Sequence, residues 1–271
     1  MMDVMANTQD FNGKWALVTG ASAGIGAALA RELARHGAKL ILTARRKDRL
    51  EALAAELTAK GTEVRIVTAD LNDPAAPQQI YDSTEGAGIA VDILINNAGL
   101  GQFGFFAQND IDQELSQVRV NCEAVARLTR LFVPRMVERR RGWVMVVASL
   151  AAYVPMPYLS TYAATKAFDR SFALGLAGEV ARFGIKVTAL CPGPTESEFS
   201  QVARSGGRRR GGSAQTAEEV ARLGVVALAR GQRTMIPYFG GKFTALLVRF
   251  LPAGLITYSI EKGARPETHS A

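Results

Sequence analysis

The sequence predicts an α/β fold of three layers, in which helices cover both faces of a doubly wound parallel sheet. Three observations predict it. Short apolar, β-rich runs alternate with Ala-, Leu- and Arg-rich stretches of helical periodicity. A glycine or polar motif follows each run. The length of 271 residues suits a single domain over 1–271, with a core at about 13–194 and a variable substrate loop and C-terminal helical extension at 195–271.

The strands are expected at the apolar runs, which lie at residues 15–19, 39–43, 64–69, 91–95, 143–148 and 186–191, with a seventh near 234–236. Two helices can be delimited from their periodicity and their ends. Residues 27–36 alternate apolar and polar positions at helical spacing and stop at Gly37. Residues 48–60 repeat this pattern and stop at Gly61. A glycine directly after the last turn is a common way for a helix to end.

Positive charge predominates, because 32 lysine and arginine residues outnumber 25 acidic ones and give a net charge of +7. Such a surface favours anionic ligands, nucleotides among them. No aromatic residues interleave with the arginine clusters at 135–141 and 204–210, so nucleic acid is not an expected partner. A solvated helix end explains the first cluster, and a mobile glycine-rich loop over 205–213 explains the second.

Cysteine and histidine usage argues against disulfides and metals. Cys122 and Cys191 offer no disulfide framework and fit a reducing cytosol. The two histidines, His36 and His269, are far apart in the sequence, so no metal site is expected. Residues 1–13 lack the apolar segment of a signal peptide, and we therefore expect a cytoplasmic protein.

A glycine-rich turn follows the first predicted strand and reads Gly-Ala-Ser-Ala-Gly-Ile-Gly from Gly20. Gly20, Gly24 and Gly26 let the backbone turn tightly and approach a pyrophosphate, while the helix start offers N–H groups and a positive dipole. Ser22 and Ile25 lie within the turn and are expected to contact the same ligand. The spacing differs from the common Gly-x-Gly-x-x-Gly dinucleotide fingerprint, so a glycine turn without a ligand is the alternative.

The end of the second strand indicates which nucleotide binds. Sites for NAD usually place an acidic residue about 20 residues beyond the glycines, on the ribose 2′-hydroxyl. Residues 43–46 read Thr-Ala-Arg-Arg instead, and an arginine there can pair with a 2′-phosphate. We therefore expect NADP(H) rather than NAD(H), with Arg45 as the main contact and Ser22 and Arg46 as weaker ones. Solvated arginines at a helix start are the alternative.

The next two strand ends add polar and glycine residues. Asp70 and Leu71 follow the third strand, where a carboxylate can accept a hydrogen bond from the adenine amino group, although a helix N-cap explains Asp70 equally well. Asn97, Ala98 and Gly99 follow the fourth, and Gly99 lets the backbone pass close to a ribose. Because ligands bind outside the carboxyl ends of the strands in an open parallel sheet, these motifs together predict a nucleotide site.

Tyr162 and Lys166 lie four residues apart in a predicted helix, so their side chains project from one side of it. An ammonium stabilises a nearby phenolate, and such a phenol can pass a proton to or from a carbonyl oxygen near neutral pH. Ser149 ends the fifth run, upstream of Tyr162. Taken singly, Tyr162 could be a half-buried aromatic residue and Ser149 a strand-end cap, but their joint occurrence favours a hydride-transfer site.

In order and spacing, these motifs resemble those of the short-chain dehydrogenase/reductase superfamily. The resemblance covers about residues 13–194 and rests on Thr19-Gly20-x-x-x-Gly24-x-Gly26, Asn96-Asn97-Ala98-Gly99, Ser149, Tyr162-x-x-x-Lys166 and Pro192-Gly193. It implies a Rossmann-type sheet and an NADP(H)-dependent oxidoreductase that transfers hydride between the nicotinamide C4 and a carbonyl or secondary alcohol. A non-catalytic NADP-binding sensor or scaffold protein with the same fold is the alternative.

The resemblance also implies a role for each site residue. Tyr162 is the general acid/base, Lys166 supports its phenolate and binds the nicotinamide ribose, and Ser149 hydrogen-bonds the substrate oxygen. Asn121 is implied to hold a helix kink and a water that relays protons towards Lys166. Three further residues follow the sixth strand and are implied to bind the cofactor, the last of them through the nicotinamide carboxamide: Pro192, Gly193 and Thr195.

The resemblance ends before the C-terminal region. Many family members end in a strand followed by Asp-Gly-Gly that packs a tetramer, and this chain lacks that ending. We therefore expect a homodimer through the helices around Asn121 and Tyr162, or else a homotetramer. An amphipathic helix is expected over 243–260, packed on the body, on a partner or on a membrane surface. Apolar and aromatic residues at 101–107 and 153–158 suit an apolar carbonyl or alcohol substrate, although core packing explains the same residues almost as well.

Overall fold

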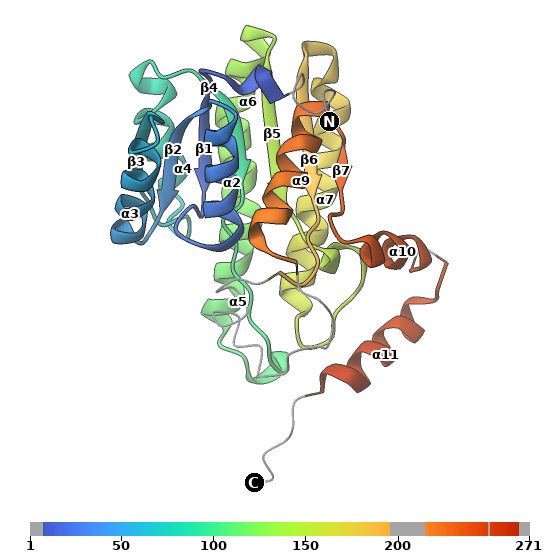
Figure 1. The fold of residues 1–271 in the computed structure, drawn as a ribbon. Coiled ribbons are helices and arrows are strands. Elements are labelled where there is room, and N and C mark those ends of the chain that lie inside the picture. Colours follow the sequence, from blue (N-terminus) through green and yellow to red (C-terminus); the bar gives the residue numbers. More distant parts are fainter. Residues whose placement is uncertain (1–7, 196–214, 249, 266–271) are drawn as a thin grey trace.

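The computed structural model describes residues 8–195, 215–248 and 250–265, which form three layers with helices on both faces of a central sheet (Figure 1). Within these residues the sheet has seven parallel strands in the order β3-β2-β1-β4-β5-β6-β7. The strands are β1 (Trp15–Thr19), β2 (Lys39–Ala44), β3 (Val64–Thr68), β4 (Val91–Asn96), β5 (Gly142–Val147), β6 (Ile185–Leu190) and β7 (Thr234–Met235). The chain runs outward from β1 to β3 and then returns to β4, so the predicted doubly wound topology is confirmed.

The strands form where the apolar runs predict them, with ends that differ by no more than one residue. Every residue of β4 and β5 is buried, as expected for central parallel strands covered on both faces. Thr19 pairs with Thr43 and Val147 with Leu190, so the strand ends lie level with one another. We call this side of the sheet, at which β1 to β6 end, the carboxyl edge.

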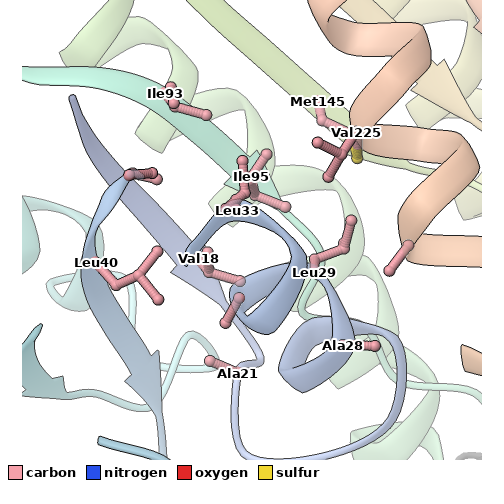
Figure 2. Packing of buried hydrophobic residues seen from close by; sticks show 14 of the residues in the cluster. Val18, Ala21, Ala28, Leu29, Leu33, Leu40, Ile93, Ile95, Met145 and Val225 are labelled. Atoms are coloured by element: carbon pink, nitrogen blue, oxygen red, sulfur yellow. The ribbon is translucent and has the colours of Figure 1, made fainter. Parts of the chain in front are cut away.

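Helices α2 (Gly24–Arg35), α3 (Lys47–Thr58) and α9 (Ala217–Arg230) cover one face of the sheet. Figure 2 shows part of this layer, in which Leu29 and Leu33 of α2 pack with Val18, Ile95 and Val225. Helices α4 (Ala76–Asp82), α6 (Ala124–Arg139) and α7 (Ser160–Val180) cover the other face, and α5 (Ile111–Val118) packs beside α7.

The first arginine cluster lies at the end of α6, where it is not simply solvated. Arg139 donates to Glu85 at 2.8 Å, and Arg141 lies 3.2 Å from Asp92, whose side chain is buried. These ion pairs fix the end of α6 against η2 (Glu85–Ala87) and against the start of β4. The second cluster and the predicted loop over 205–213 lie outside the described residues.

The expectation of one helix over 243–260 is wrong. The structure has α10 (Phe239–Leu247) and α11 (Ala253–Ala264), with Pro252 as the N-cap of the second. Proline has no backbone N–H and disfavours helical geometry in the preceding residue, so a continuous helix cannot pass this point without cost. In Figure 1, α11 extends away from the sheet. No helix in the described part of the chain combines the length and the apolar character needed to cross a bilayer.

Candidate active site

The glycine turn joins β1 to α2 at the carboxyl edge. Gly20 has a φ of 66°, and a Cβ there would lie 2.8 Å from the Cα of Ala98. A Cβ on Gly26 would overlap with the carbonyl oxygen of Gly20 and the side-chain amide of Asn97. The N-cap of α2 is Ala23, which provides no side-chain cap, so the first N–H groups of this helix point to the turn without a capping acceptor. This is the arrangement that phosphate groups occupy at helix starts.

Hydrogen bonds connect the start of the glycine turn to the loop that follows β4. The amide of Asn97 donates to the carbonyl oxygen of Thr19 at 2.9 Å. The Thr19 hydroxyl accepts from the backbone N–H groups of Asn97 at 3.0 Å and Ala98 at 3.1 Å. Thr19 was not among the predicted site residues, yet its buried hydroxyl holds these two loops in register. A threonine as the last residue of the strand before a glycine turn is the signal that could have indicated it.

The predicted 2′-phosphate contacts gather beside the turn. The guanidinium of Arg46 donates to the Ser22 hydroxyl at 3.1 and 3.3 Å. Arg45 lies 3.9 Å from the carboxylate of Asp70, and its side chain is 59% exposed. The ends of β1, β2 and β3 therefore present one exposed, mainly basic patch.

Asp70 is not a helix N-cap. Its carboxylate accepts from the backbone N–H of Asn72 at 3.0 Å within a turn, and α4 begins only at Ala76. Such a side-chain to backbone bond two residues on is typical of an Asx turn. The side chain of Leu71 is buried in the core.

Lys166 lies beneath the carboxyl edge and is almost fully buried, with a side chain 5% exposed. Its ammonium donates to the carbonyl oxygen of Val147 at 2.8 Å and to the carboxylate of Asp169 at 2.9 Å. The same nitrogen lies 6.0 Å from the centroid of the Tyr162 ring. A Cβ on Gly99 would lie 3.4 Å from this nitrogen, so the loop after β4 passes close above the ammonium.

Asn121 occupies a π-helical segment, η4 (Arg119–Glu123), between α5 and α6. The predicted helix kink coincides with this segment. The side chain is fully buried, donates to the Leu100 carbonyl and to the Thr165 hydroxyl at 2.9 Å each, and accepts from the Leu100 N–H at 2.8 Å. Asn121 therefore ties the loop after β4 to the residue next to Lys166.

The remaining predicted residues lie after β5 and β6. Ser149 is the N-cap of η5 (Leu150–Tyr153) and accepts from the Ala151 N–H at 3.1 Å, a bond that does not use its hydroxyl proton. Leu150 donates its N–H to the Pro192 carbonyl at 2.8 Å, which places the two loops side by side. Thr195 donates to the Gly193 carbonyl at 3.0 Å.

Asp169 was missed from the sequence, although an acid three residues after Lys166 on one helix is a readable signal. Burial is the largest single influence and would lower the pKa of Lys166, but the charge of Asp169, the charge of Tyr162 and the hydrogen bond to Asp169 together outweigh it and raise that pKa. Burial raises the pKa of Asp169, and the ammonium opposes that rise. The second carboxylate oxygen of Asp169 is buried and has no hydrogen-bond partner among the described residues.

The sheet order, with a glycine turn where the winding reverses, defines the Rossmann class of α/β proteins. The chain belongs to the short chain dehydrogenase family, whose family model matches residues 14–207. This confirms the resemblance seen in the sequence.

Individual relatives agree with this assignment. A short-chain dehydrogenase from Sphingobium yanoikuyae in complex with NADPH is 32% identical, with a TM-score of 0.78, and the match covers 95% of this chain and 98% of that chain. The bulky-bulky ketone specific alcohol dehydrogenase from Comamonas testosteroni is 28% identical, with a TM-score of 0.75 and coverage of 96% and 98%. A very-long-chain 3-oxoacyl-CoA reductase from Anas platyrhynchos is 34% identical over 71% of this chain. The match spans only 63% of that reductase's length.

Proposed function

We propose that this protein is an NADP(H)-dependent oxidoreductase that transfers hydride between the nicotinamide C4 and a carbonyl or secondary alcohol. The observation that carries the proposal is the buried Lys166 ammonium at the end of β5, 6.0 Å from the ring of Tyr162. A cation in this position stabilises a phenolate, and a tyrosine so placed can act as general acid and base. A sensor that only binds a nucleotide has no need of this pair.

The residues at the carboxyl edge fit a dinucleotide. Any side chain at Gly26 would fill the cradle formed with Gly20 and Asn97, and the uncapped start of α2 suits a pyrophosphate. When bound, the nicotinamide would supply or accept the hydride. The turn residues Gly24 and Ile25 and the loop residues Ala98, Gly99, Pro192, Gly193 and Thr195 are proposed to contact the same ligand.

Side chains of the protein itself are proposed to transfer the proton and to position the substrate and the cofactor. Tyr162 donates its hydroxyl proton to the carbonyl oxygen in the direction of reduction and accepts it back in oxidation. Ser149 donates a hydrogen bond to that oxygen and stabilises the negative charge that develops on it. Lys166 supports the phenolate and binds the ribose, and Asn121 orients Lys166 through Thr165 and the loop at Leu100.

An apolar or bulky carbonyl compound is the proposed substrate. The ring of Phe103 packs 6.0 Å from that of Tyr158, while Phe105 and Phe106 are 55% and 58% exposed. The Tyr158 hydroxyl in turn donates to Glu261 at 2.9 Å, so α11 lies next to the Phe103–Tyr158 pair. The names of two relatives support the same substrate class: the Comamonas protein is a bulky-bulky ketone specific alcohol dehydrogenase, and the Anas protein is a very-long-chain 3-oxoacyl-CoA reductase.

The function is tested by following NADPH oxidation with a panel of ketones and 3-oxoacyl thioesters graded by size and polarity. Turnover of the larger apolar members supports the proposal. NADPH binding without oxidation by any member would favour the sensor or scaffold instead, because that alternative requires affinity and no chemistry.

The preference for NADP(H) is proposed to rest on Arg45, assisted by Ser22 and Arg46. Arg45→Ala is expected to raise the KM for NADPH by about tenfold or more, since a charge-assisted hydrogen bond contributes roughly 1.5–3 kcal/mol. The KM for NADH should change by less than about twofold. Arg222→Ala, which removes an exposed arginine from α9, is the matched control. Equal effects of Arg45→Ala on both cofactors would remove the assignment.

A homodimer through α5 and α7 is the proposed assembly, with a homotetramer as the larger alternative. Exposed apolar side chains gather on these two adjacent helices, namely Ile111, Leu115, Val118 and Phe168. Monomeric proteins rarely leave such residues together in water. A monomer mass in light scattering of the full chain at micromolar concentration would contradict the proposal.

We further propose a cytoplasmic enzyme that touches anionic membrane surfaces through α10 and α11. Phe243 and Phe250 are 66% and 78% exposed, and the exposed Lys242 and Lys262 lie on the same two-helix segment. Replacing both phenylalanines by aspartate should reduce co-sedimentation with phosphatidylserine vesicles at least about fivefold. Phe105→Asp, at an exposed phenylalanine outside this segment, is the control. A wild-type chain that stays in the supernatant would contradict membrane contact.

A further inference from the structure

We propose that Asp169 is a positioning residue that competes with the Tyr162 phenolate for the charge of Lys166 and thereby sets the pH at which Tyr162 loses its proton. The inference deepens the proposed function and rests on it for its meaning. It concerns how the chain tunes its acid/base group before any ligand is present.

The geometry of the pair is tight. Asp169 lies three residues after Lys166 on α7, and their side chains are 1% and 5% exposed. The ion pair measures 2.9 Å, and the second bond of the ammonium, to Val147, holds the same nitrogen at the end of β5. Because Lys166 is buried, water screens its charge little. The electrostatic interactions of its ammonium with Asp169 and with Tyr162 are therefore strong.

The site therefore contains one cation and two groups that can carry a negative charge. Asp169 already neutralises the ammonium, so ionising the half-buried Tyr162 gives the cluster a net negative charge beside two buried side chains. That costs free energy, because burial disfavours an uncompensated charge. Without the carboxylate, the phenolate would become the counter-ion of Lys166 and would form at lower pH.

The remaining groups that surround the pair do not provide this charge balance. Burial raises the pKa of Cys122, on η4, and of Cys191, after β6, to about 11 in each case. Both thiols therefore stay neutral below this pH. The guanidinium of Arg170, the neighbour of Asp169 on α7, lies 4.4 Å from the ring centroid of Tyr153. Burial also raises the pKa of Tyr153.

The test is a titration of tyrosinate absorbance in the protein without cofactor or substrate. Subtracting the signal of the Tyr162→Phe variant isolates Tyr162. Asp169→Asn keeps the size of the side chain and removes its charge, and it is expected to lower the Tyr162 midpoint by about one pH unit or more. Asp169→Glu keeps the charge and should return the midpoint towards that of the wild type.

Asp92→Asn is the matched control. Asp92 is also a buried, ion-paired aspartate, but it pairs with Arg141 at the opposite edge of the sheet. Asp92→Asn should lower the free energy of unfolding and leave the titration midpoint of Tyr162 unchanged. Asp169→Ser provides a second uncharged side chain in case the amide of asparagine prevents folding.

An unchanged or raised midpoint in folded, uncharged Asp169 variants would overturn the inference. In active enzyme, the alkaline limb of the kcat profile for carbonyl reduction should move to lower pH by the same amount, because reduction needs protonated Tyr162. The titration needs no turnover, so a failure of the proposed function and a failure of this inference remain distinguishable.

Discussion

Replacing Tyr162 by phenylalanine is expected to lower kcat by about 10³-fold or more, while the Kd for NADPH stays within about twofold of the wild type. The substitution removes one hydroxyl and keeps the ring that lies 6.0 Å from the Lys166 ammonium. Packing of α7 and the position of Lys166, held by Val147 and Asp169, should therefore persist. What is lost is the group that exchanges a proton with the substrate oxygen.

The measurement pairs single-turnover oxidation of NADPH with a fluorescence titration of the same nucleotide. Tyr81→Phe is the control, because Tyr81 packs against Phe132 far from the carboxyl edge and its hydroxyl accepts only from Arg135 in the described structure. That variant should keep its activity. Turnover of Tyr162→Phe within about tenfold of the wild type would show that another group handles the proton.

The residues at the carboxyl edge can be predicted from the sequence because short, local patterns identify them. Buried runs of branched residues identify the strands, and the residue after each run must lie at one edge of a parallel sheet. Helical spacing places Tyr162 and Lys166 on one side of a helix, and the motifs at the strand ends identify the pair as part of a site. Pro252 is an equally local signal, and it separates two helices where the apolar content of residues 243–260 predicts one.

The contacts missed from the sequence depend on packing between distant segments. Thr19 meets the loop after β4 only because β1 and β4 are neighbours in the sheet. Asn121 bonds Thr165 across two helices, which no spacing rule predicts. Asp169 could be placed near Lys166 by spacing, but its role depends on both side chains being buried. The sequence thus indicates which residues lie near the carboxyl edge, while the structure shows which of them contact one another.

Gly26→Ala is expected to have the second largest effect, on stability and nucleotide binding together. The added methyl group would overlap with the backbone carbonyl of Gly20, which cannot rotate away as a side chain could, and with the amide of Asn97. That amide also donates to the Thr19 carbonyl. To avoid the overlap, the glycine turn and the loop after β4 must therefore move apart. We expect a loss of about 2–3 kcal/mol in the free energy of unfolding, in the range of overpacked cores.

The same displacement should weaken NADPH binding by about tenfold or more, because it would move the turn that precedes the uncapped start of α2. Gly178→Ala on α7 is the matched control, since a Cβ there meets no atom within 4 Å and alanine favours a helix. It should be neutral or stabilising. Urea unfolding and nucleotide titration of both variants separate the effects. If Gly26→Ala keeps wild-type affinity, the turn does not hold the pyrophosphate, because a ligand seated there contacts the backbone that this methyl group displaces.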